Sequence, residues 1–246
     1  MKTFLLFGLL FLIKSCSSLT MPYTFKRCDK RTSDFNDCLS DAIQDAISQL
    51  DRPMEEYGLP SLEPLQLSNV SPRLGRKVDF QHSYKNFKIY GRTKISKTKA
   101  NMNFYDKTLA IQLTNPEVRY EFDYEAKGKM FLLPIDTSGH ATVILHNVTY
   151  DVTYMFGEHT KDNKKYFQVI DFNFEMKPQD VTLLFQNLLK DKELNDAFSR
   201  AMSKDWKQVF GGIGYLYAQT YGKTYSVIFN NFLSKVPITE IFNGVN

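Results

Sequence analysis

The sequence has no apolar run long enough to cross a membrane, very few cysteines and little net charge. Its longest apolar stretch is Phe4–Ile13, whereas a helix that spans the roughly 30 Å hydrocarbon core of a bilayer needs about 20 apolar residues. Lys2 precedes this stretch, and the small residues Ser15–Ser18 follow it. This is the layout of a secretory signal peptide. We therefore expect residues 1–18 to be a signal peptide and residues 19–246 to form one secreted domain without stable membrane insertion.

An excess of charge of either sign is also missing. The chain has 31 basic and 27 acidic residues, and its formal net charge falls from +4 to +2 when Lys2 and Lys14 leave with the signal peptide. A nearly neutral chain has no broad electrostatic attraction for nucleic acid or for an acidic surface. We therefore expect no nucleic-acid partner.

Motifs for catalysis and for metal or nucleotide binding are absent from the sequence. It contains no Gly-x-Ser-x-Gly elbow, no P-loop and no dinucleotide-binding glycine pattern. No two histidines have the i, i+4 spacing of a zinc protease, and the acidic residues of 120–125 alternate as the solvated face of a strand. The histidines are His82, His140 and His146, in or beside predicted strands, and His159 in a predicted turn. We expect neither an enzyme nor a cofactor or metal site.

Cysteine is nearly absent from the mature chain. Cys16 lies in the signal peptide, so only Cys28 and Cys38 remain. Two cysteines in an exported protein most economically form one disulfide, and closing so short a loop contributes about 3 kcal/mol in the chain-entropy model. Free thiols or an intermolecular bond are the alternatives. The sequons at Asn69 and Asn147 are candidate glycosylation sites, and Asn147 must point outward from a predicted strand to be used.

A first helix is predicted from Asp37 to Arg52. Its apolar residues recur at helical spacing, Asn36 or Asp37 can cap its start, and Pro53 ends it. The apolar stripe consists of Leu39, Ala42, Ile43, Ala46, Ile47 and Leu50. An extended linker with two prolines, residues 58–64, follows.

From Val78 onward the apolar period changes to two, which predicts long strands with one buried face. Short connections predict antiparallel neighbours, and long strands with tight turns predict a strongly curved sheet. The predicted inner faces are Val118, Tyr120, Phe122 and Tyr124; Ile144, His146, Val148, Tyr150, Val152 and Tyr154; and Tyr166, Gln168, Ile170, Phe172, Phe174 and Met176. Hairpin turns are predicted at 126–129, 136–139 and 159–163.

The last quarter of the chain is predicted to be helical, from Glu193 to Lys235. Apolar residues recur at helical spacing over this segment, which would be roughly 65 Å long if continuous. Gly211, Gly212 and Gly214 interrupt it, and each costs roughly 1 kcal/mol relative to Ala inside a helix. We therefore expect a kink or a break near Gly211.

Together these elements predict an α+β fold in which a long C-terminal helix is wrapped by a strongly curved antiparallel sheet, with a short N-terminal helix. Helix and sheet both bring wide apolar faces that nothing else covers, so they can enclose a tunnel for an apolar ligand. For any single residue, ordinary core packing is the simpler interpretation. The predicted lining consists of Tyr120, Phe122, Tyr124, Phe172, Phe174, Phe198, Met202, Val209, Ile213 and Tyr217.

Several short motifs occur in an informative order after the two early cysteines. They are Gly58–Leu65, Leu133–Gly139, Asn187–Leu194, Asp205-Trp206 and Phe232–Pro237. In order and spacing they resemble the insect juvenile hormone-binding/takeout family over about residues 22–243. The resemblance implies an apolar tunnel that holds a hormone, fatty acid or other isoprenoid-like lipid.

The expected function is therefore that of a secreted, monomeric carrier of a small hydrophobic ligand. The alternative is a secreted recognition or signalling protein with a packed interior and a protein partner. A hydrolase of hydrophobic esters has no supporting motif.

Overall fold

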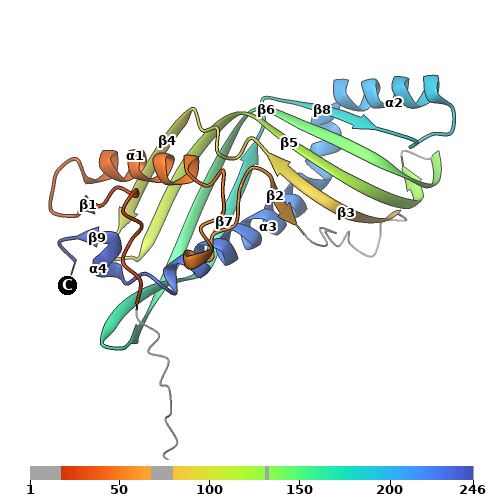
Figure 1. Cartoon of the computed structure of the whole chain (residues 1–246). Coiled ribbons are helices and arrows are strands. Elements are labelled where there is room, and N and C mark those ends of the chain that lie inside the picture. Colours follow the sequence, from red (N-terminus) through yellow and green to blue (C-terminus); the bar gives the residue numbers. More distant parts are fainter. Residues whose placement is uncertain (1–17, 68–79, 131–132, 246) are drawn as a thin grey trace, which may run out of the picture.

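The long helix α3 (Trp206–Leu233) runs along an antiparallel sheet of seven strands (Figure 1). The computed structural model describes residues 18–67, 80–130 and 133–245, so residues 1–17 of the predicted signal peptide and the sequon at Asn69 lie outside the described part. The predicted α+β fold, with a C-terminal helix against a curved antiparallel sheet, is confirmed. The strands of this sheet are β2 (Leu65–Leu67), β3 (Phe80–Tyr90), β4 (Lys97–Asn103), β5 (Thr108–Met130), β6 (Leu133–Lys161), β7 (Lys164–Lys177) and β8 (Asp180–Phe185).

Shorter elements lie at the two ends of the sheet, where α1 and α2 are far apart (Figure 1). The parallel pair β1–β9 joins the N-terminal segment to the C-terminal segment. These elements are β1 (Cys28–Asp29), α1 (Phe35–Ser48), the 3-10 helix η1 (Glu55–Tyr57), α2 (Lys192–Lys204), α4 (Ile238–Ile241) and β9 (Phe242–Asn243).

The hairpin of β5 and β6 extends through both halves of the sheet. β5 has 23 residues and β6 has 29, so each is long enough to pair with two shorter strands on its outer edge. In one half the order is β4–β5–β6–β7, and in the other it is β3–β5–β6–β8. The two halves therefore share one continuous hairpin.

The burial pattern of β6 changes phase where the two halves meet. Pairing with β5 is interrupted at Asn147, which has a left-handed φ of 45° opposite Pro116, a residue without a backbone donor. Leu145 is 1% exposed and Val148 is 0% exposed, so the inner face shifts by one residue across the interruption. The prediction that Ile144 and His146 face inward is therefore wrong.

A second phase shift occurs in β7. The register with β6 shifts between Met155 and Phe156, which leaves Ile170 without a partner, and this side chain is 66% exposed. The prediction that Ile170 and Gln168 lie on the inner face is wrong because the bulge moves the alternation. The position of such a bulge depends on how the two strands pair, and no periodic pattern of apolar residues predicts it.

Only one of the three predicted hairpin turns is a turn. Asp162 and Asn163 both have left-handed φ values, of 48° and 58°, and connect β6 to β7. Segments 126–129 and 136–139 instead pair with each other inside β5 and β6, and His159 lies in β6 rather than in a turn. At Gly139 a Cβ atom would lie 2.0 Å from the Gln186 carbonyl oxygen, so this glycine permits a close backbone contact.

The C-terminal helical region is broken, but not at the glycines. α2 ends at Lys204 and α3 begins at Trp206, with Asp205 (φ −107°, ψ 30°) between them, whereas α3 continues through Gly211. The predicted break at Gly211 is therefore wrong. Packing of α3 along the sheet outweighs the loss of helix propensity at a few glycines. The helical region is interrupted instead at the end of α2, just after the contact of Ser203 with β8.

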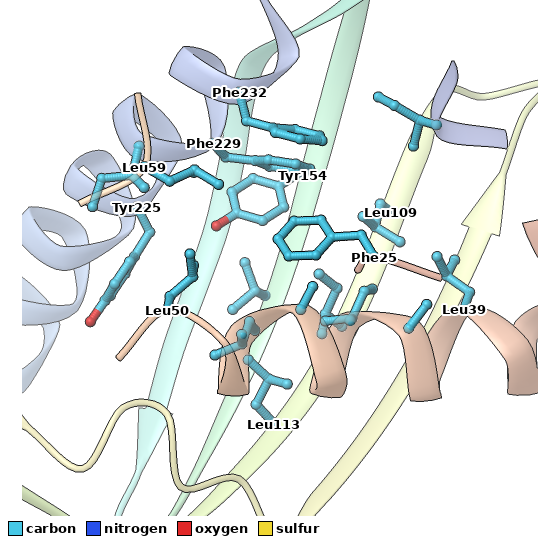
Figure 2. Close-up of a pocket in the computed structure, with 18 of the residues that line it drawn as sticks. Phe25, Leu39, Leu50, Leu59, Leu109, Leu113, Tyr154, Tyr225, Phe229 and Phe232 are labelled. Atoms are coloured by element: carbon cyan, nitrogen blue, oxygen red, sulfur yellow. The ribbon is translucent and has the colours of Figure 1, made fainter. Parts of the chain in front are cut away.

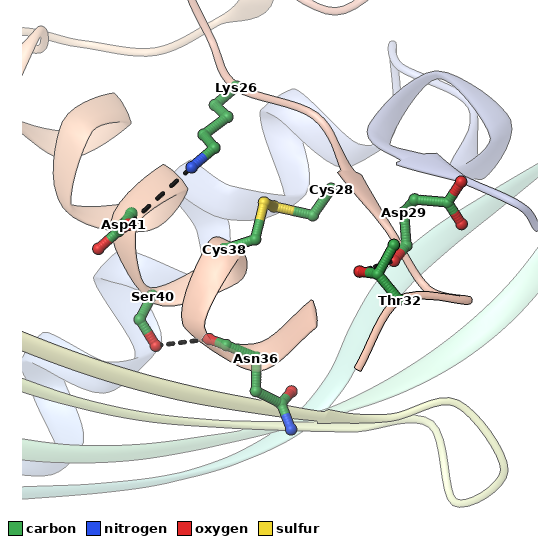
Figure 3. The surroundings of a disulfide bond; sticks show 8 residues. All are labelled: Lys26, Cys28, Asp29, Thr32, Asn36, Cys38, Ser40 and Asp41. Atoms are coloured by element: carbon green, nitrogen blue, oxygen red, sulfur yellow. Dashed lines mark hydrogen bonds and ion pairs between the residues drawn. A yellow bond between two sulfur atoms is a disulfide. The ribbon is translucent and has the colours of Figure 1, made fainter. Parts of the chain in front are cut away.

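The predicted disulfide between Cys28 and Cys38 is confirmed and joins β1 to the first turns of α1 (Figure 3). The helix begins at Phe35 rather than Asp37 and ends at Ser48, before Arg52. Asn36 does not cap it. The Asn36 side-chain oxygen instead accepts a hydrogen bond from the Met102 N–H of β4 at 3.3 Å.

Candidate functional site

Two apolar cavities lie between the sheet and the helices, one in each half. The α1 cavity, of about 260 Å³, lies between α1, the second half of α3 and strands β5 to β7. The α2 cavity, of about 430 Å³, lies between β3, β5, β6, β8, α2 and the first half of α3. The two cavities have no lining residue in common.

The α1 cavity is lined by the whole apolar stripe of α1, and Phe25 points into its centre (Figure 2). Aromatic rings of β6 and α3 face α1 across this space, with Tyr154 and Phe229 at a centroid distance of 5.4 Å. Other residues that line this cavity include Leu59, Leu109, Leu113, Phe174, Tyr225 and Phe232. The stripe is thus the wall of a cavity.

The α2 cavity is rich in aromatic side chains that carry a few polar atoms. The hydroxyls of Tyr84 on β3 and Tyr217 on α3 share a hydrogen bond of 2.6 Å, which joins sheet to helix. Burial raises the pKa of both tyrosines and raises the pKa of Tyr124 to about 12. Burial lowers the pKa of His82. These groups are therefore neutral at neutral pH and offer hydrogen bonds without charge.

A group of stacked tyrosines stands between the two cavities. Tyr120 of β5 stacks on Tyr221 of α3 at 5.5 Å and 8°. Tyr150 and Tyr225 lie beside them and hold the guanidinium of Arg92, whose Cζ is 4.1 Å and 4.9 Å from the two ring centroids. Burial raises the pKa of Tyr120, Tyr221 and Tyr225, so these hydroxyls stay protonated. We call these four rings and Arg92 the tyrosine partition.

The turn that carries Arg92 is held by two polar side chains. The Gly91 N–H donates to both Glu63 carboxylate oxygens, at 2.8 and 2.9 Å, and the Thr93 hydroxyl donates to one of them at 3.2 Å. The Asn115 amide donates to the carbonyls of Gly91, Arg92 and Lys94 at 2.8 to 3.3 Å. These bonds fix the backbone from which the Arg92 side chain enters the interior.

The structure distributes the predicted lining residues unevenly. Six of them line the α2 cavity, namely Tyr120, Phe122, Tyr124, Met202, Val209 and Tyr217. Phe174 lines the α1 cavity, whereas Phe172 and Phe198 are partly buried and line neither. The side chain of Ile213 lies outside the described part of the structure.

The residues that sequence reasoning missed are mainly those of the α1 cavity. The stripe of α1 was visible as an apolar face, but periodicity does not distinguish a cavity wall from a packed core. Arg92 gave no signal, because a single arginine between strands is ordinarily a surface residue.

Neither a metal site nor a membrane-spanning helix occurs among the described residues. No group of three or more His, Cys, Asp or Glu side chains there could hold a metal ion. None of the helices in that part combines the length and apolar character needed to cross a bilayer. What the two cavities offer is enclosure of apolar surface with a few fixed hydrogen-bonding groups.

Comparison with known proteins places this architecture among binding proteins. Residues 5–243 match the family described as haemolymph juvenile hormone binding protein (JHBP). The circadian clock-controlled protein daywake of Drosophila melanogaster is 24% identical over 232 residues, covering 90% of this chain and 88% of the relative. Its Drosophila yakuba counterpart is 22% identical over 239 residues, covering 93% and 90%. The crystal structure of Epiphyas postvittana Takeout 1 has the same fold, with a TM-score of 0.77 at 20% identity over 88% of this chain and 99% of that one.

Proposed function

The chain belongs to the haemolymph juvenile hormone binding protein family, and from this premise we propose that it is a secreted, monomeric carrier of a small hydrophobic ligand. The observation that carries the proposal is the pair of apolar cavities, of about 260 and 430 Å³, that the fold leaves between sheet and helices. Protein interiors ordinarily leave few voids larger than a water molecule. Space of this size, lined by Phe, Tyr, Leu and Met, suits a lipid.

The energetics of apolar burial are sufficient for such a carrier. Burying about 400 Å² of apolar ligand surface at about 25 cal/mol/Å² gives roughly 10 kcal/mol before the costs of association. Association costs of several kcal/mol leave an affinity in the micromolar to nanomolar range. Binding of this kind needs no cofactor and no catalytic group.

Two features support export of the carrier. The disulfide Cys28–Cys38 is of the kind that persists in oxidising compartments. Asn147 is exposed on β6, as the use of its sequon requires. Secretion, and glycosylation at Asn147 or Asn69, are therefore part of the proposal.

The alternative is a recognition protein with a packed interior. The two cavities do not favour it, because in a packed interior side chains would fill this space. Native mass spectrometry and lipid extraction of the purified protein test the carrier function directly. We expect a copurifying lipid, or micromolar or tighter binding from a panel of fatty acids, isoprenoids and sterols. Absence of both would contradict the proposal.

Two matched variants distinguish the cavities. Ala46→Phe adds a ring to the wall of the α1 cavity, and Ala126→Phe adds one to the wall of the α2 cavity. The variant that fills the occupied cavity should lower ligand affinity at least ~10-fold, while the other should leave affinity within about threefold. If both variants bind as tightly as the unmodified protein, the ligand lies in neither cavity.

A further inference from the structure

We propose that the α1 cavity binds a lipid with a carboxylate head group, and that Arg92 is the residue that binds this carboxylate. The inference rests on the proposed carrier function and names the chemical class of its ligand. It is carried by a buried cation that faces an apolar cavity without a matching anion.

Arg92 is buried, and two of its three guanidinium nitrogens are unsatisfied. The residue is 7% exposed and lines the α1 cavity. Its Nε and Nη1 atoms are buried and have no hydrogen-bond partner in the described residues, and no carboxylate there lies within ion-pair distance of it. An arginine side chain stays charged in proteins. The cavity therefore contains a permanent positive charge with free N–H donors.

The aromatic contacts of Arg92 orient the guanidinium and leave its Nε and Nη1 donors without a partner. Tyr150 and Tyr225 approach its Cζ at 4.1 and 4.9 Å from their ring centroids. Cation–π contacts of this kind stabilise the charge through the ring faces. The Nε and Nη1 N–H groups remain available in the plane of the guanidinium, where a carboxylate oxygen can accept a charge-assisted hydrogen bond.

The carboxylate that contacts this turn, that of Glu63, has another role. Both oxygens of the Glu63 carboxylate accept hydrogen bonds from Gly91 and Thr93. Glu63 and Asn115 thus position the turn without neutralising Arg92. Burying a charge is costly unless a partner compensates it, and a ligand carboxylate would supply the missing partner.

The rest of the α1 cavity fits an alkyl chain. Tyr150, which Arg92 contacts, pairs with Leu113 on β5, and the cavity continues along β5 to Leu109. Four residues of strand correspond to about 14 Å, so a medium-length alkyl chain can extend from Arg92 toward Phe25. The other cation of the lining, Lys26, is at the rim: its side chain is 52% exposed and lies 3.9 Å from Asp41.

Binding of three probes with the same alkyl chain tests the head-group assignment. Dodecanoic acid, methyl dodecanoate and 1-dodecanol are titrated into the delipidated full chain by calorimetry, with native mass spectrometry to count bound molecules. We expect the acid to bind at least ~10-fold more tightly than the ester or the alcohol, because removing one partner of a buried, hydrogen-bonded charge pair has an effect at least this large.

The variant Arg92→Met should abolish the preference for the acid while leaving ester binding within about threefold. Arg119→Met is the matched control, because Arg119 also lies over a tyrosine ring, that of Tyr90 at 4.7 Å, but its side chain is 43% exposed and lines neither cavity. This control should retain the preference. Lys26→Met should also retain it, and a loss in that variant would move the carboxylate to the rim and overturn the assignment.

Stability measurements separate ligand recognition from a structural role for Arg92. Replacing an unpaired buried charge by an apolar side chain of similar length is expected to be neutral or stabilising, so delipidated Arg92→Met should melt at the same or a higher temperature. If Arg92→Met melts lower and binds all three probes more weakly, Arg92 is structural and the inference is wrong. If that variant does not fold, Arg92→Lys, which keeps the charge but loses the fork, should retain part of the acid preference.

The two proposals fail in different ways. Equal binding of all three probes, unchanged by Arg92→Met, would overturn the carboxylate assignment and leave the carrier function intact. If none of these probes and no member of the wider lipid panel binds, the carrier function itself fails.

Discussion

Buried polar side chains determine how particular segments of this protein are placed against one another. The pattern of apolar residues alone does not determine this. Asn115 is 0% exposed and donates to three carbonyls of the turn that carries Arg92. The 2.6 Å hydrogen bond between Tyr84 and Tyr217 similarly sets the separation of β3 and α3 beside the α2 cavity. Such groups must be paired when buried, so each one selects a single arrangement of its neighbours.

Removing both hydroxyls of the tyrosine pair should cost less than the sum of removing each one alone. Tyr84→Phe or Tyr217→Phe leaves a partly buried hydroxyl unpaired, and we expect the free energy of unfolding to fall by about 1 to 2 kcal/mol. The double variant should lose less than the sum of the two. Chemical denaturation of all three variants measures this, with Tyr105→Phe as control because Tyr105 is 93% exposed. Strictly additive losses would mean that the hydroxyls do not interact.

Each of the three longer helices uses polar side chains to satisfy the backbone of a strand. Ser40 of α1 accepts from the Ala100 N–H of β4 at 2.8 Å, and Ser203 of α2 accepts from the Leu183 N–H of β8 at 2.8 Å. In α3, Asn230 both accepts from the Val169 N–H of β7 and donates to the Val169 carbonyl. Edge strands are thereby covered, and the helices are placed against the sheet at defined heights.

Two glycines of α3 should respond to the same substitution in opposite ways. At Gly211 a Cβ atom would have no neighbour within 4 Å, so Gly211→Ala should raise the free energy of unfolding by about 0.5 to 1 kcal/mol through helix propensity. At Gly222 the Cβ atom would lie 2.4 Å from the Phe172 ring and 2.8 Å from the Phe174 Cβ. Gly222→Ala should therefore destabilise by about 1 to 3 kcal/mol.

Thermal unfolding of the two glycine variants, measured side by side, checks this prediction. Gly211 lies in the segment where the sequence predicts a kink, so its response reports whether the helix is continuous there. A destabilised Gly211→Ala would indicate that α3 is not a regular helix at this position.

The molecule as a whole is organised around the β5–β6 hairpin, which contributes walls to both cavities. The N-terminal and C-terminal segments of the chain contact each other at one end of the structure. There Cys28 pairs with Phe242, and the Leu19 N–H donates to the Lys235 carbonyl at 2.9 Å. Because neither half has a sheet of its own, we propose that residues 19–246 form one cooperative domain.

A single unfolding transition is the expected result for one domain. Trp206, the sole tryptophan, lies in the wall of the α2 cavity, so its fluorescence reports that half of the molecule. Far-ultraviolet circular dichroism reports the whole sheet. The two signals should change at the same denaturant concentration. An earlier fluorescence transition would show that the half containing the α2 cavity unfolds separately.

Local patterns in the sequence were sufficient to predict the elements and their faces. Strict alternation in 118–124 identified side chains that are 0 to 6% exposed, and the stripe of 39–50 identified the inner face of α1. The cysteine pair predicted the disulfide. These predictions succeed because a strand or helix must bury one face wherever it packs, so the period of apolar residues is fixed by local geometry.

Only the tertiary structure decided what the inner faces enclose. The interruption at Asn147 and the bulge beside Ile170 arise from pairing between strands. The break at Asp205 is marked by no glycine or proline beside it. Long-range contacts bring Arg92 between Tyr150 and Tyr225 and divide the interior into two cavities. The sequence determined which residues are apolar and at what spacing. Whether those residues meet one another or leave space depends on the separation of helix and sheet, which is set by contacts that have no local period.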